Sequence, residues 1–317
     1  MRVLQVEATG KAPVLRNIEA PRPGAGELLI EVRACGLNFA DLLQIDGVYQ
    51  ERLEPPFVLG RELSGLVAEC RDADGFRAGD RVAAHVGSGG LAELAAVPAE
   101  RCLKLPSSMP FEQAAAFQVT YGTSHLALVR RAQLQSGETL LVLGAAGGVG
   151  LTAVEIGRNL GATVIAVARG RERLEVARRA GAHHLLDRDT ADVRQAVIEF
   201  GGADVVYDPV GGEMFAAALR ACRPEARYLL VGFAGGVPEV RPNHLLVKNA
   251  SVIGHYWGGY LKFRPDVLTG SLRELLDWYE RGQIHPHVGT TLPLDRALEG
   301  LEMLRRRTST GKVVILP

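Results

Sequence analysis

The glycine-rich run LLVLGAAGGVG, at residues 140–150, contains the residues best suited to chemistry. A hydrophobic, strand-like stretch leads directly into it, and a helical pattern follows. Small residues there let the backbone turn tightly and let a diphosphate approach the helix N-terminus, where free N–H groups and the helix dipole stabilise anionic oxygens. Relative to the pattern G-x-G-x-x-G, Ala145 replaces the first glycine. In this strand–loop–helix setting, the run predicts dinucleotide contacts at Ala146, Gly147, Gly148, Val149 and Gly150. A close-packed turn that binds nothing is the alternative.

Arginine, rather than an acidic residue, follows the second strand of this pattern. Arg169 comes directly after TVIAVA, residues 163–168, and Arg173 lies four residues further on. Arg188 follows the third strand. A carboxylate at this place would hold the ribose hydroxyls of NAD and repel a 2′-phosphate, whereas arginines bind phosphate through charge-assisted hydrogen bonds. We therefore expect NADPH in preference to NADH. The alternative is that some of these arginines only solvate the start of a helix.

Composition narrows the class of partner. Lys plus Arg and Asp plus Glu each total 36 in 317 residues, so the chain has no broad field to attract nucleic acid or an anionic membrane. Its cysteines are far apart and form no C-x-x-C pair, which argues against a zinc ribbon or a disulfide framework; they are Cys35, Cys70, Cys102 and Cys222. The apolar run in the N-terminal stretch MRVLQVEATG is shorter than a signal peptide needs, and no apolar run reaches the length of about 20 residues that would span a bilayer. We expect a soluble, cytoplasmic protein with a small-molecule substrate.

Strand patterns alternate with helical stretches in the second half of the chain. The six strand candidates are LLVLG (140–144), TVIAVA (163–168), HHLLD (183–187), DVVYD (204–208), YLLVG (228–232) and SVIGH (251–255). This alternation predicts a parallel sheet with right-handed crossovers, and six strands is the number of a full dinucleotide-binding fold. The helix after the first strand has a single apolar face made of Val149, Ala153, Ile156 and Leu160.

The two ends of the chain show other patterns. Residues 1–118 have no long helical period and read as short strands between Gly and Pro residues, which predicts an irregular β-barrel or roll. Near the C-terminus, Ser271 and Glu274 form an S-x-x-E capping box, so we expect a helix to begin there and to end by Gly282. A second helix is expected near Asp295. The final KVVILP reads as a strand that returns to the N-terminal domain.

Taken together, these segments resemble the medium-chain dehydrogenase/reductase superfamily, and more narrowly its zinc-free, zeta-crystallin-like quinone oxidoreductase branch. The matching stretches, in family order, are ACGLNFADLLQIDGVY, PPFVLGRELSGLV, GFRAGDRVAA, LLVLGAAGGVGLTAVEIGRNLGATVIA, DVVYDPVGG, LLVGFAGG and TGKVVILP. The resemblance implies an α/β fold with a six-stranded doubly wound parallel (Rossmann) sheet plus a GroES-like irregular β-barrel domain. It implies a GroES-like catalytic domain at 1–118, an NADPH-binding domain at 119–258, and a C-terminal segment at 259–317 that returns to the catalytic domain. Relatives are usually dimers, and SVIGH is an expected edge strand for joining two sheets.

The resemblance also raises the question of a metal. Zinc-dependent relatives have a cysteine ligand where this chain has Asn38 and a histidine ligand, in the pattern G-H-E-x-x-G, where it has Arg61. A guanidinium offers no lone pair and stays protonated, and zinc needs three or four N, S or O ligands. The four-cysteine structural zinc lobe is missing as well. We therefore expect no metal, and a conjugated acceptor that forms a delocalised anion rather than a simple alcohol that needs a Lewis acid.

Site residues follow from the resemblance, position by position. Asn38 and Tyr49 match substrate-cleft positions, where Asn38 would donate to a quinone oxygen, and Thr123 matches a residue beside the nicotinamide ring. The other matches fall in cofactor-contacting segments, to which we also assign Lys312 of TGKVV; they are Val210, Gly232, Phe233, Ala234, His255, Tyr256 and Trp257. Simpler interpretations are a loop aromatic for Tyr49, a helix-start cap for Thr123 and a strand histidine for His255. Leu43 stands where some relatives have a pocket tyrosine, which makes the cleft less polar.

The sequence thus predicts an NADPH-dependent oxidoreductase that transfers hydride, without metal, to a quinone or similar conjugated carbonyl acceptor in the cleft between domains. An enoyl or 2-alkenal reductase on the same fold is the nearest alternative. A non-catalytic NADPH-binding protein comes next, and a zinc alcohol dehydrogenase last. Glu62 is expected only to pair with its neighbour Arg61.

Overall fold

The computed structural model describes residues 1–317, which form two compact units. The first unit contains Met1–Val119 and Pro286–Pro317, and the second contains Thr120–His285. The sequence placed the return of the chain at residue 259. In the structure residues 259–285 pack within the second unit, so the return begins at Pro286.

The first unit consists mainly of antiparallel strands. Its elements are β1 (Arg2–Val6), β2 (Val14–Asn17), β3 (Glu27–Gly36), α1 (Phe39–Ile45), β4 (Phe57–Val58), β5 (Glu62–Arg71), β6 (Arg81–His85), β7 (Leu94–Pro98), β8 (Cys102–Lys104), α2 (Phe111–Ala115), β15 (Val288–Pro293), α11 (Ala297–Arg306) and β16 (Lys312–Leu316), with short 3₁₀ turns at Ala99–Arg101 and Leu294–Arg296. One sheet has the order β15-β16-β3-β5-β6-β8, with β7 paired to β3, and a smaller sheet has the order β2-β1-β4.

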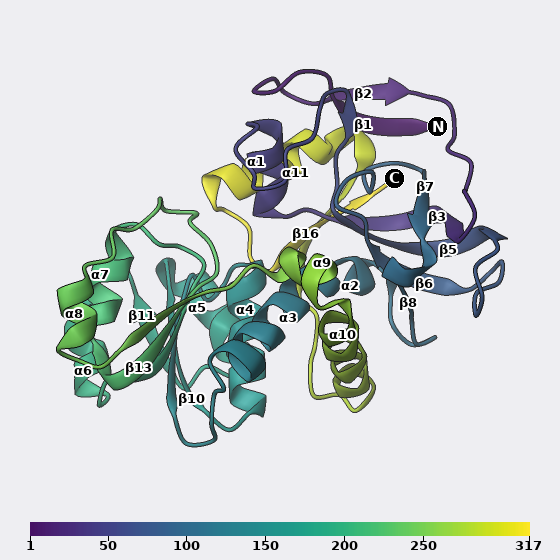
Figure 1. Cartoon of the computed structure of the whole chain (residues 1–317). Helices are drawn as coiled ribbons and strands as arrows, with labels where there is room; N and C mark the ends of the chain where they lie inside the picture. The colour runs from purple at the N-terminus through teal and green to yellow at the C-terminus, as the bar shows by residue number, and fades with distance from the viewer. The chain divides into compact units, whose positions relative to one another are not determined.

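The C-terminal strand is part of this first unit. β16 pairs antiparallel with β3 through Val314 opposite Gly36 and Ile315 opposite Cys35. In Figure 1 the yellow strand β16 runs beside the purple strand β3 of the N-terminal segment. The predicted return of KVVILP is therefore confirmed, and Val313 and Ile315 join Leu37 and Leu42 in one buried cluster.

The second unit contains the alternating strands and helices. Its elements are α3 (Gln118–His125), which begins two residues before the unit boundary, a π-helical turn at Leu126–Arg131, β9 (Thr139–Leu143), α4 (Gly148–Asn159), β10 (Thr163–Ala168), α5 (Gly170–Arg179), β11 (His184–Asp187), α6 (Val193–Glu199), β12 (Ala203–Asp208), α7 (Glu213–Arg220), β13 (Cys222–Leu230), α8 (Pro242–Leu246), β14 (Ser251–Gly254), a 3₁₀ turn at Trp257–Gly259, α9 (Tyr260–Phe263) and α10 (Pro265–Glu280). All strand pairs are parallel and the order is β11-β10-β9-β12-β13-β14, so the six predicted strands and the dinucleotide-binding topology are confirmed.

Helices cover both faces of this sheet. Leu141, Ile165 and Val206 pack with the apolar sides of α6 and α7. On the other face α4 lies close to the sheet, because a Cβ at Gly157 would meet the Leu140 side chain at 2.4 Å. The sequence predicted one apolar face for α4, yet every residue from Gly150 to Gly157 is buried, since α3 covers its second side. None of the helices is both long and apolar enough to cross a membrane.

The predicted helix start at Ser271 is wrong. α10 begins six residues earlier, at Pro265, so Ser271 lies inside the helix. Its hydroxyl meets His125 Nδ1 of α3 at 2.8 Å, and the carboxylate of Glu274 lies 3.6 Å from His125 Nε2. Both residues of the supposed capping box therefore face a buried histidine, a spacing of three that a helix interior produces as readily as a helix start. The second tail helix begins at Ala297, close to the predicted Asp295.

Candidate functional site

The glycine loop lies where the strand order of the parallel sheet reverses. β9 is the central strand, and β10 and β12 pair with its two opposite edges. In folds of this kind ligands bind at the carboxyl end of the sheet, at the place where the strand order reverses. Gly144 has φ +62°, and a Cβ at Gly150 would lie 2.2 Å from the Gly144 carbonyl oxygen. Glycine is therefore required at Gly150 so that α4 can start directly against the turn.

The start of α4 also has the chemistry of an anion site. Gly147 occupies its N-cap position and makes no side-chain capping bond, so the first-turn N–H groups are not claimed by a cap. A Cβ at Gly147 would have one contact, 3.4 Å from the Gly144 oxygen, so the approach to these groups is open. The residues present fit the diphosphate of a dinucleotide, whose charge would face the positive end of a twelve-residue helix.

Two further loops at the carboxyl edge of the sheet join the glycine loop. A Cβ built on Gly144 would lie 3.0 Å from Val210 Cγ2, which places the predicted residue Val210 against the turn. Gly235 donates to the Val210 carbonyl at 2.6 Å, and Gly212 donates to the Gly236 carbonyl at 2.9 Å. The segment 232–236, with its half-exposed Phe233, is therefore fixed to the segment 209–212.

Asp208, which was not among the residues predicted from the sequence, holds the loop that contains Val210. Its Oδ1 accepts the backbone N–H groups of Val210 at 2.7 Å and Gly211 at 2.8 Å, and its Oδ2 accepts the Tyr228 hydroxyl at 2.8 Å. Burial raises the pKa of this carboxyl group, while these three hydrogen bonds oppose the rise. An aspartate that ends a buried strand before Pro-Val-Gly-Gly is a signal for such a turn, because Asp side chains bond backbone two residues on.

The three predicted phosphate-binding arginines occupy the next position along the sheet. Arg169 is the N-cap residue of α5, Arg173 lies in the first turns of α5, and Arg188 follows β11. Arg169 and Arg188 lie within 4.0 Å of the same carboxylate, Asp189. The structure thus brings Arg169 and Arg188 together at the ends of β10 and β11, where a 2′-phosphate is expected.

Thr123 and the segment His255–Trp257 meet in the second unit. A Cβ at Gly122 would lie 2.5 Å from Trp257 Nε1, so Gly122 lets the indole pack against α3 beside Thr123. Burial and the nearby charge of Arg131 lower the pKa of His255 to about 4, against a smaller opposite effect of the Thr123 backbone. His255 is therefore a neutral imidazole at physiological pH.

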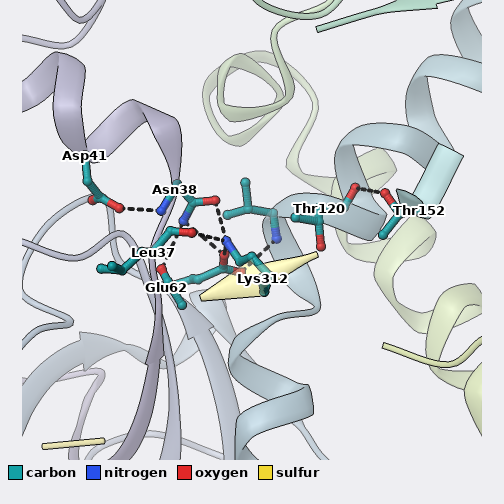
Figure 2. A network of polar contacts seen from close by, with 9 residues as sticks. Leu37, Asn38, Asp41, Glu62, Thr120, Thr152 and Lys312 are labelled. Carbon is teal, nitrogen blue, oxygen red and sulfur yellow. Dashed lines mark hydrogen bonds and ion pairs between the residues drawn. The ribbon is translucent and has the colours of Figure 1, made fainter. Parts of the chain in front are cut away.

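Hydroxyl groups connect α3 to the start of α4. The Ser124 hydroxyl meets those of Thr152 at 2.7 Å and Tyr207 at 2.9 Å, and Thr152 also donates to the Thr120 carbonyl at 3.1 Å. Figure 2 shows the Thr152–Thr120 bond. These buried contacts fix the helix that carries Thr123 relative to the glycine loop, and single polar residues in a helix gave no sequence signal for them.

The first unit contains a buried ionic network around Lys312. Its ammonium lies 2.6 Å from Glu62 Oε1, donates to Asn38 Oδ1 at 2.6 Å and donates to the Leu37 carbonyl at 2.8 Å. Figure 2 shows these groups pointing toward one another. Three acceptors use the three N–H donors of the ammonium, and Lys312 is 4% exposed. Lys312 therefore has no donor left over, and its predicted contact with the cofactor stays a prediction that this bonding does not favour.

Asn38 is equally occupied. Its Nδ2 donates to Glu62 Oε1 at 3.0 Å and to the Gly36 carbonyl at 3.1 Å, so both amide hydrogens are used. Donation to a quinone oxygen would require one of these bonds to break. The second Glu62 oxygen accepts the Val119 N–H at 3.0 Å, so this carboxylate ties β5 to the last residue of the N-terminal segment of the first unit.

Asp41 extends the network into α1. Its Oδ2 accepts the Asn38 N–H at 2.7 Å, which caps α1, while Oδ1 is buried without a hydrogen-bond partner. Complete burial raises the pKa of Asp41 from 3.8 to about 6, although the Asn38 N–H and the charges of Arg61 and Lys312 oppose the rise.

The expected pairing of Glu62 with Arg61 is wrong. Neighbouring residues of an extended chain point to opposite sides, so Glu62 reaches Lys312 while Arg61 faces Tyr49 and Glu51. The Arg61 guanidinium carbon lies 4.5 Å from the Tyr49 ring centroid, and Arg61 is 3% exposed. The Tyr49 ring is thus a cation–π partner of Arg61. This contact is separate from the hydrogen bonds that the Asn38 amide makes. No group of three or more His, Cys, Asp or Glu side chains is arranged to hold a metal ion.

The chain is similar over most of its length to proteins and protein families that are already known. An alcohol dehydrogenase GroES-like domain family matches residues 24–107, and a zinc-binding dehydrogenase family matches residues 148–280. The chain is 39% identical to quinone oxidoreductase-like protein 2 homolog of Nematostella vectensis, over 99% of this chain and 88% of that protein. It is 38% identical to quinone oxidoreductase-like protein 2 of Bos taurus, over 96% and 89%.

Solved structures agree in fold over the full length. The quinone oxidoreductase of Thermus thermophilus, whose crystal structures include a complex with NADPH, has 33% identity and a TM-score of 0.90, with 100% of each chain covered. The Escherichia coli quinone oxidoreductase complexed with NADPH has 26% identity and a TM-score of 0.92, again with 100% of each chain covered.

Proposed function

We propose that this chain, which belongs to the zinc-independent, quinone oxidoreductase-like branch of the medium-chain dehydrogenase/reductase family, is an NADPH-dependent reductase of a quinone or similar conjugated carbonyl acceptor. The observation that carries the proposal is the uncapped, glycine-lined start of α4 at the reversal point of the parallel sheet. The naming of its relatives as quinone oxidoreductase-like, and the NADPH complexes of similar structures, support the same activity.

Bound NADPH would supply the hydride, and the side chains of this chain bind and orient it. The first-turn N–H groups of α4 bind the diphosphate, and Arg169, Arg173 and Arg188 bind the 2′-phosphate. Val210 and the 232–236 segment, fixed through Asp208, line the same edge of the sheet. The neutral His255 adds no positive charge near Thr123, where we expect the nicotinamide.

The class of acceptor follows from the donor set. Arg61 and Asn38 stand where zinc ligands would be, and neither a guanidinium nor an amide nitrogen has a lone pair to give a metal. A quinone or an alkene conjugated to a carbonyl delocalises the charge that arrives with the hydride, so hydrogen-bond donors and water suffice. We expect Asn38 and Tyr49 to orient the acceptor; to do so, Asn38 would exchange its bond to the Gly36 carbonyl or to Glu62 for a bond to the acceptor oxygen.

The cofactor part of the proposal is tested by Arg169→Ala combined with Arg173→Ala. The doubly substituted protein should lose at least tenfold in affinity for NADPH, measured by fluorescence titration, while affinity for NADH changes little. Unchanged NADPH affinity would mean that Arg169 and Arg173 do not bind the 2′-phosphate.

The acceptor part is tested by turnover. We expect NADPH oxidation at saturating cofactor to be faster with a 1,4-quinone than with a 2-alkenal of similar size. Faster reduction of the alkenal would favour the enoyl reductase alternative, and tight NADPH binding without oxidation of either acceptor would favour a non-catalytic role.

Assembly and compartment are part of the same proposal. β14 is the edge strand of the parallel sheet, and the α8 region beside it in sequence exposes Leu246 at 77% and Val247 at 75%. We propose a homodimer through this edge, tested by Leu246→Asp in light-scattering measurements of mass. The four cysteines are free, which suits a reducing compartment such as the cytoplasm.

A further inference from the structure

The charged groups at the ends of β10 and β11 form a set that we name the arginine corner: Arg169, Arg188, Asp187 and Asp189. The Nε atoms of Arg169 and Arg188 lie 3.7 Å and 3.9 Å from one and the same oxygen, Asp189 Oδ1. Two like charges share a single carboxylate, so each guanidinium is only partly neutralised.

Asp187 and Asp189 differ in how firmly they are held. Asp187 Oδ2 accepts the Gly170 N–H at 3.2 Å and its Oδ1 accepts the Asp189 N–H at 3.1 Å, so it ties the turn after β11 to the start of α5. The side chain of Asp189 is 59% exposed, and its ion pairs with Arg169 and Arg188 are both longer than a normal hydrogen bond. Asp187 therefore fixes the backbone of the arginine corner, whereas the Asp189 side chain can move away from the arginines at little cost in free energy.

A phosphate and a carboxylate can bind to this pair of arginines in the same way. Both accept N–H bonds from guanidinium groups, and a dianionic phosphate competes well against one carboxylate. A phosphate that enters the corner must displace Asp189, and the released carboxylate then lies close to it and repels it. No such displacement is needed for a cofactor that has only hydroxyl groups on this ribose.

We propose that Asp189 is a specificity-determining residue that competes with the 2′-phosphate of NADPH for Arg169 and Arg188 and so narrows the preference of this chain for NADPH over NADH. The inference rests on the proposed function, because it assumes that the arginine corner binds the adenosine ribose. Asp189 thus acts against Arg169 and Arg188 in phosphate binding, whereas the sequence predicted only the arginines at this place.

The experiment measures binding of 2′,5′-ADP and 5′-ADP by isothermal titration calorimetry, with no nicotinamide and no turnover involved. Asp189→Asn should tighten 2′,5′-ADP about two- to fivefold at low salt, as expected for loss of exposed ion pairs, and leave 5′-ADP unchanged. At about 0.5 M salt the gain should shrink, because exposed charges are screened. Glu199→Gln is the matched control, since it removes one negative charge at the opposite, amino-terminal edge of the sheet.

The outcomes separate this inference from the function beneath it. Equal or weaker binding of 2′,5′-ADP to Asp189→Asn, with 5′-ADP binding intact, would mean that Asp189 orders the arginines instead of competing with phosphate, and would overturn the inference alone. The same gain in Glu199→Gln would reduce the effect to net charge and overturn it as well. A wild-type protein that binds neither nucleotide would remove the proposed function and this inference with it.

Discussion

Lys312 in the first unit and Arg169 in the second are both cations beside carboxylates, yet their surroundings differ. Lys312 is 4% exposed and its three acceptors lie at 2.6–2.8 Å. The side chain of Arg169 is 45% exposed, and its carboxylate partner lies at 3.7 Å. The network around Lys312 is complete without a ligand, whereas the arginine corner keeps donors that an anion can use.

The contrast teaches how to separate positioning residues from binding residues when both carry charge. A buried, fully bonded network fixes the backbone that passes through it, here the junction of β3, β5 and β16. Exposed cations with long contacts contribute little to stability, so their placement needs another explanation, which a bound phosphate provides. The contrast predicts stability losses in the first unit and binding changes in the second.

The largest expected effect is on the stability of the Lys312 network. Lys312→Met removes the ammonium and leaves the Glu62 carboxylate, 1% exposed, without its ionic partner. We expect a loss of about 3–5 kcal/mol in unfolding free energy, measured by urea denaturation, because breaking a buried ion pair strands a charge.

The double variant Lys312→Met with Glu62→Gln sharpens this result. It removes both charges and should recover a substantial part of the loss, which a purely steric defect would not allow. Lys11→Met, at an exposed lysine, should stay within about 0.5 kcal/mol of wild type. If Lys312→Met were equally mild, the network would not be the positioning element described above.

The next effect in size is a pH dependence at Asp41. Its pKa is raised from 3.8 in the unfolded chain to about 6 in the folded protein, so the folded state binds the proton more tightly. Stability should therefore fall as pH rises from about 4 to about 6, by up to roughly 3 kcal/mol, and stay low above that. Asp41→Asn should be more stable relative to wild type at pH 7.5 than at pH 4.

Asp266 provides the opposite sign as a control. Arg264 lowers the pKa of this exposed carboxyl group, so charging it favours the folded state. Asp266→Asn should gain no advantage over wild type as pH rises. A pH profile for Asp41→Asn that is flat or inclined the same way as that of Asp266→Asn would contradict the assigned burial of Asp41.

Hydrophobic pattern and turn chemistry were enough to predict the parallel sheet. TVIAVA coincides with β10, because a glycine lies close to each of its ends, at Gly161 and Gly170. The predicted helix start at Ser271 was wrong because S-x-x-E describes only a spacing of three residues, and in the structure Ser271 instead contacts His125, 146 positions away. Local patterns do not contain such long-range partners.

The candidate site divides in the same way. The glycine loop and the arginines are local signals next to strand ends, and strand order then places the loop at the reversal point and the arginines beside it, at the ends of β10 and β11. The bonds of Lys312 to Asn38 and Glu62 join segments 274 and 250 positions apart, and nothing in any one segment announces them. Asp208 lay between these cases, since its turn was legible from Asp-Pro-Val-Gly-Gly but was not recognised.

A smaller effect is expected on binding at the glycine loop. Gly147→Ala fits the backbone, with φ −80° and a nearest contact of 3.4 Å, so stability should be nearly unchanged. The new methyl group occupies the approach to the N–H groups of α4, and we expect about tenfold weaker NADPH binding. Gly150→Ala is the contrasting variant, because its Cβ at 2.2 Å from a carbonyl oxygen must damage the fold itself. Equal NADPH affinity in wild type and Gly147→Ala would place the diphosphate elsewhere.

The smallest expected effect lies at Tyr228. Like Lys312 in the first unit, this buried residue of the second unit contacts a carboxylate, here that of Asp208. Tyr228 is buried and donates to Asp208 Oδ2 at 2.8 Å, while Oδ1 holds the loop of Val210 and Gly211. Tyr228→Phe removes one of three hydrogen bonds to the carboxylate and should cost about 1–2 kcal/mol in urea denaturation. Because the two loop bonds remain, NADPH affinity should change less than threefold. Asp208→Asn keeps an acceptor for the loop and should also bind NADPH, whereas Asp208→Ala removes the acceptor and should raise KM for NADPH more than it lowers kcat. A loss of NADPH affinity in Tyr228→Phe as large as that in Asp208→Ala would contradict this. It would show that Asp208 affects cofactor binding through its bond to Tyr228 of β13 and not through the loop of Val210 and Gly211.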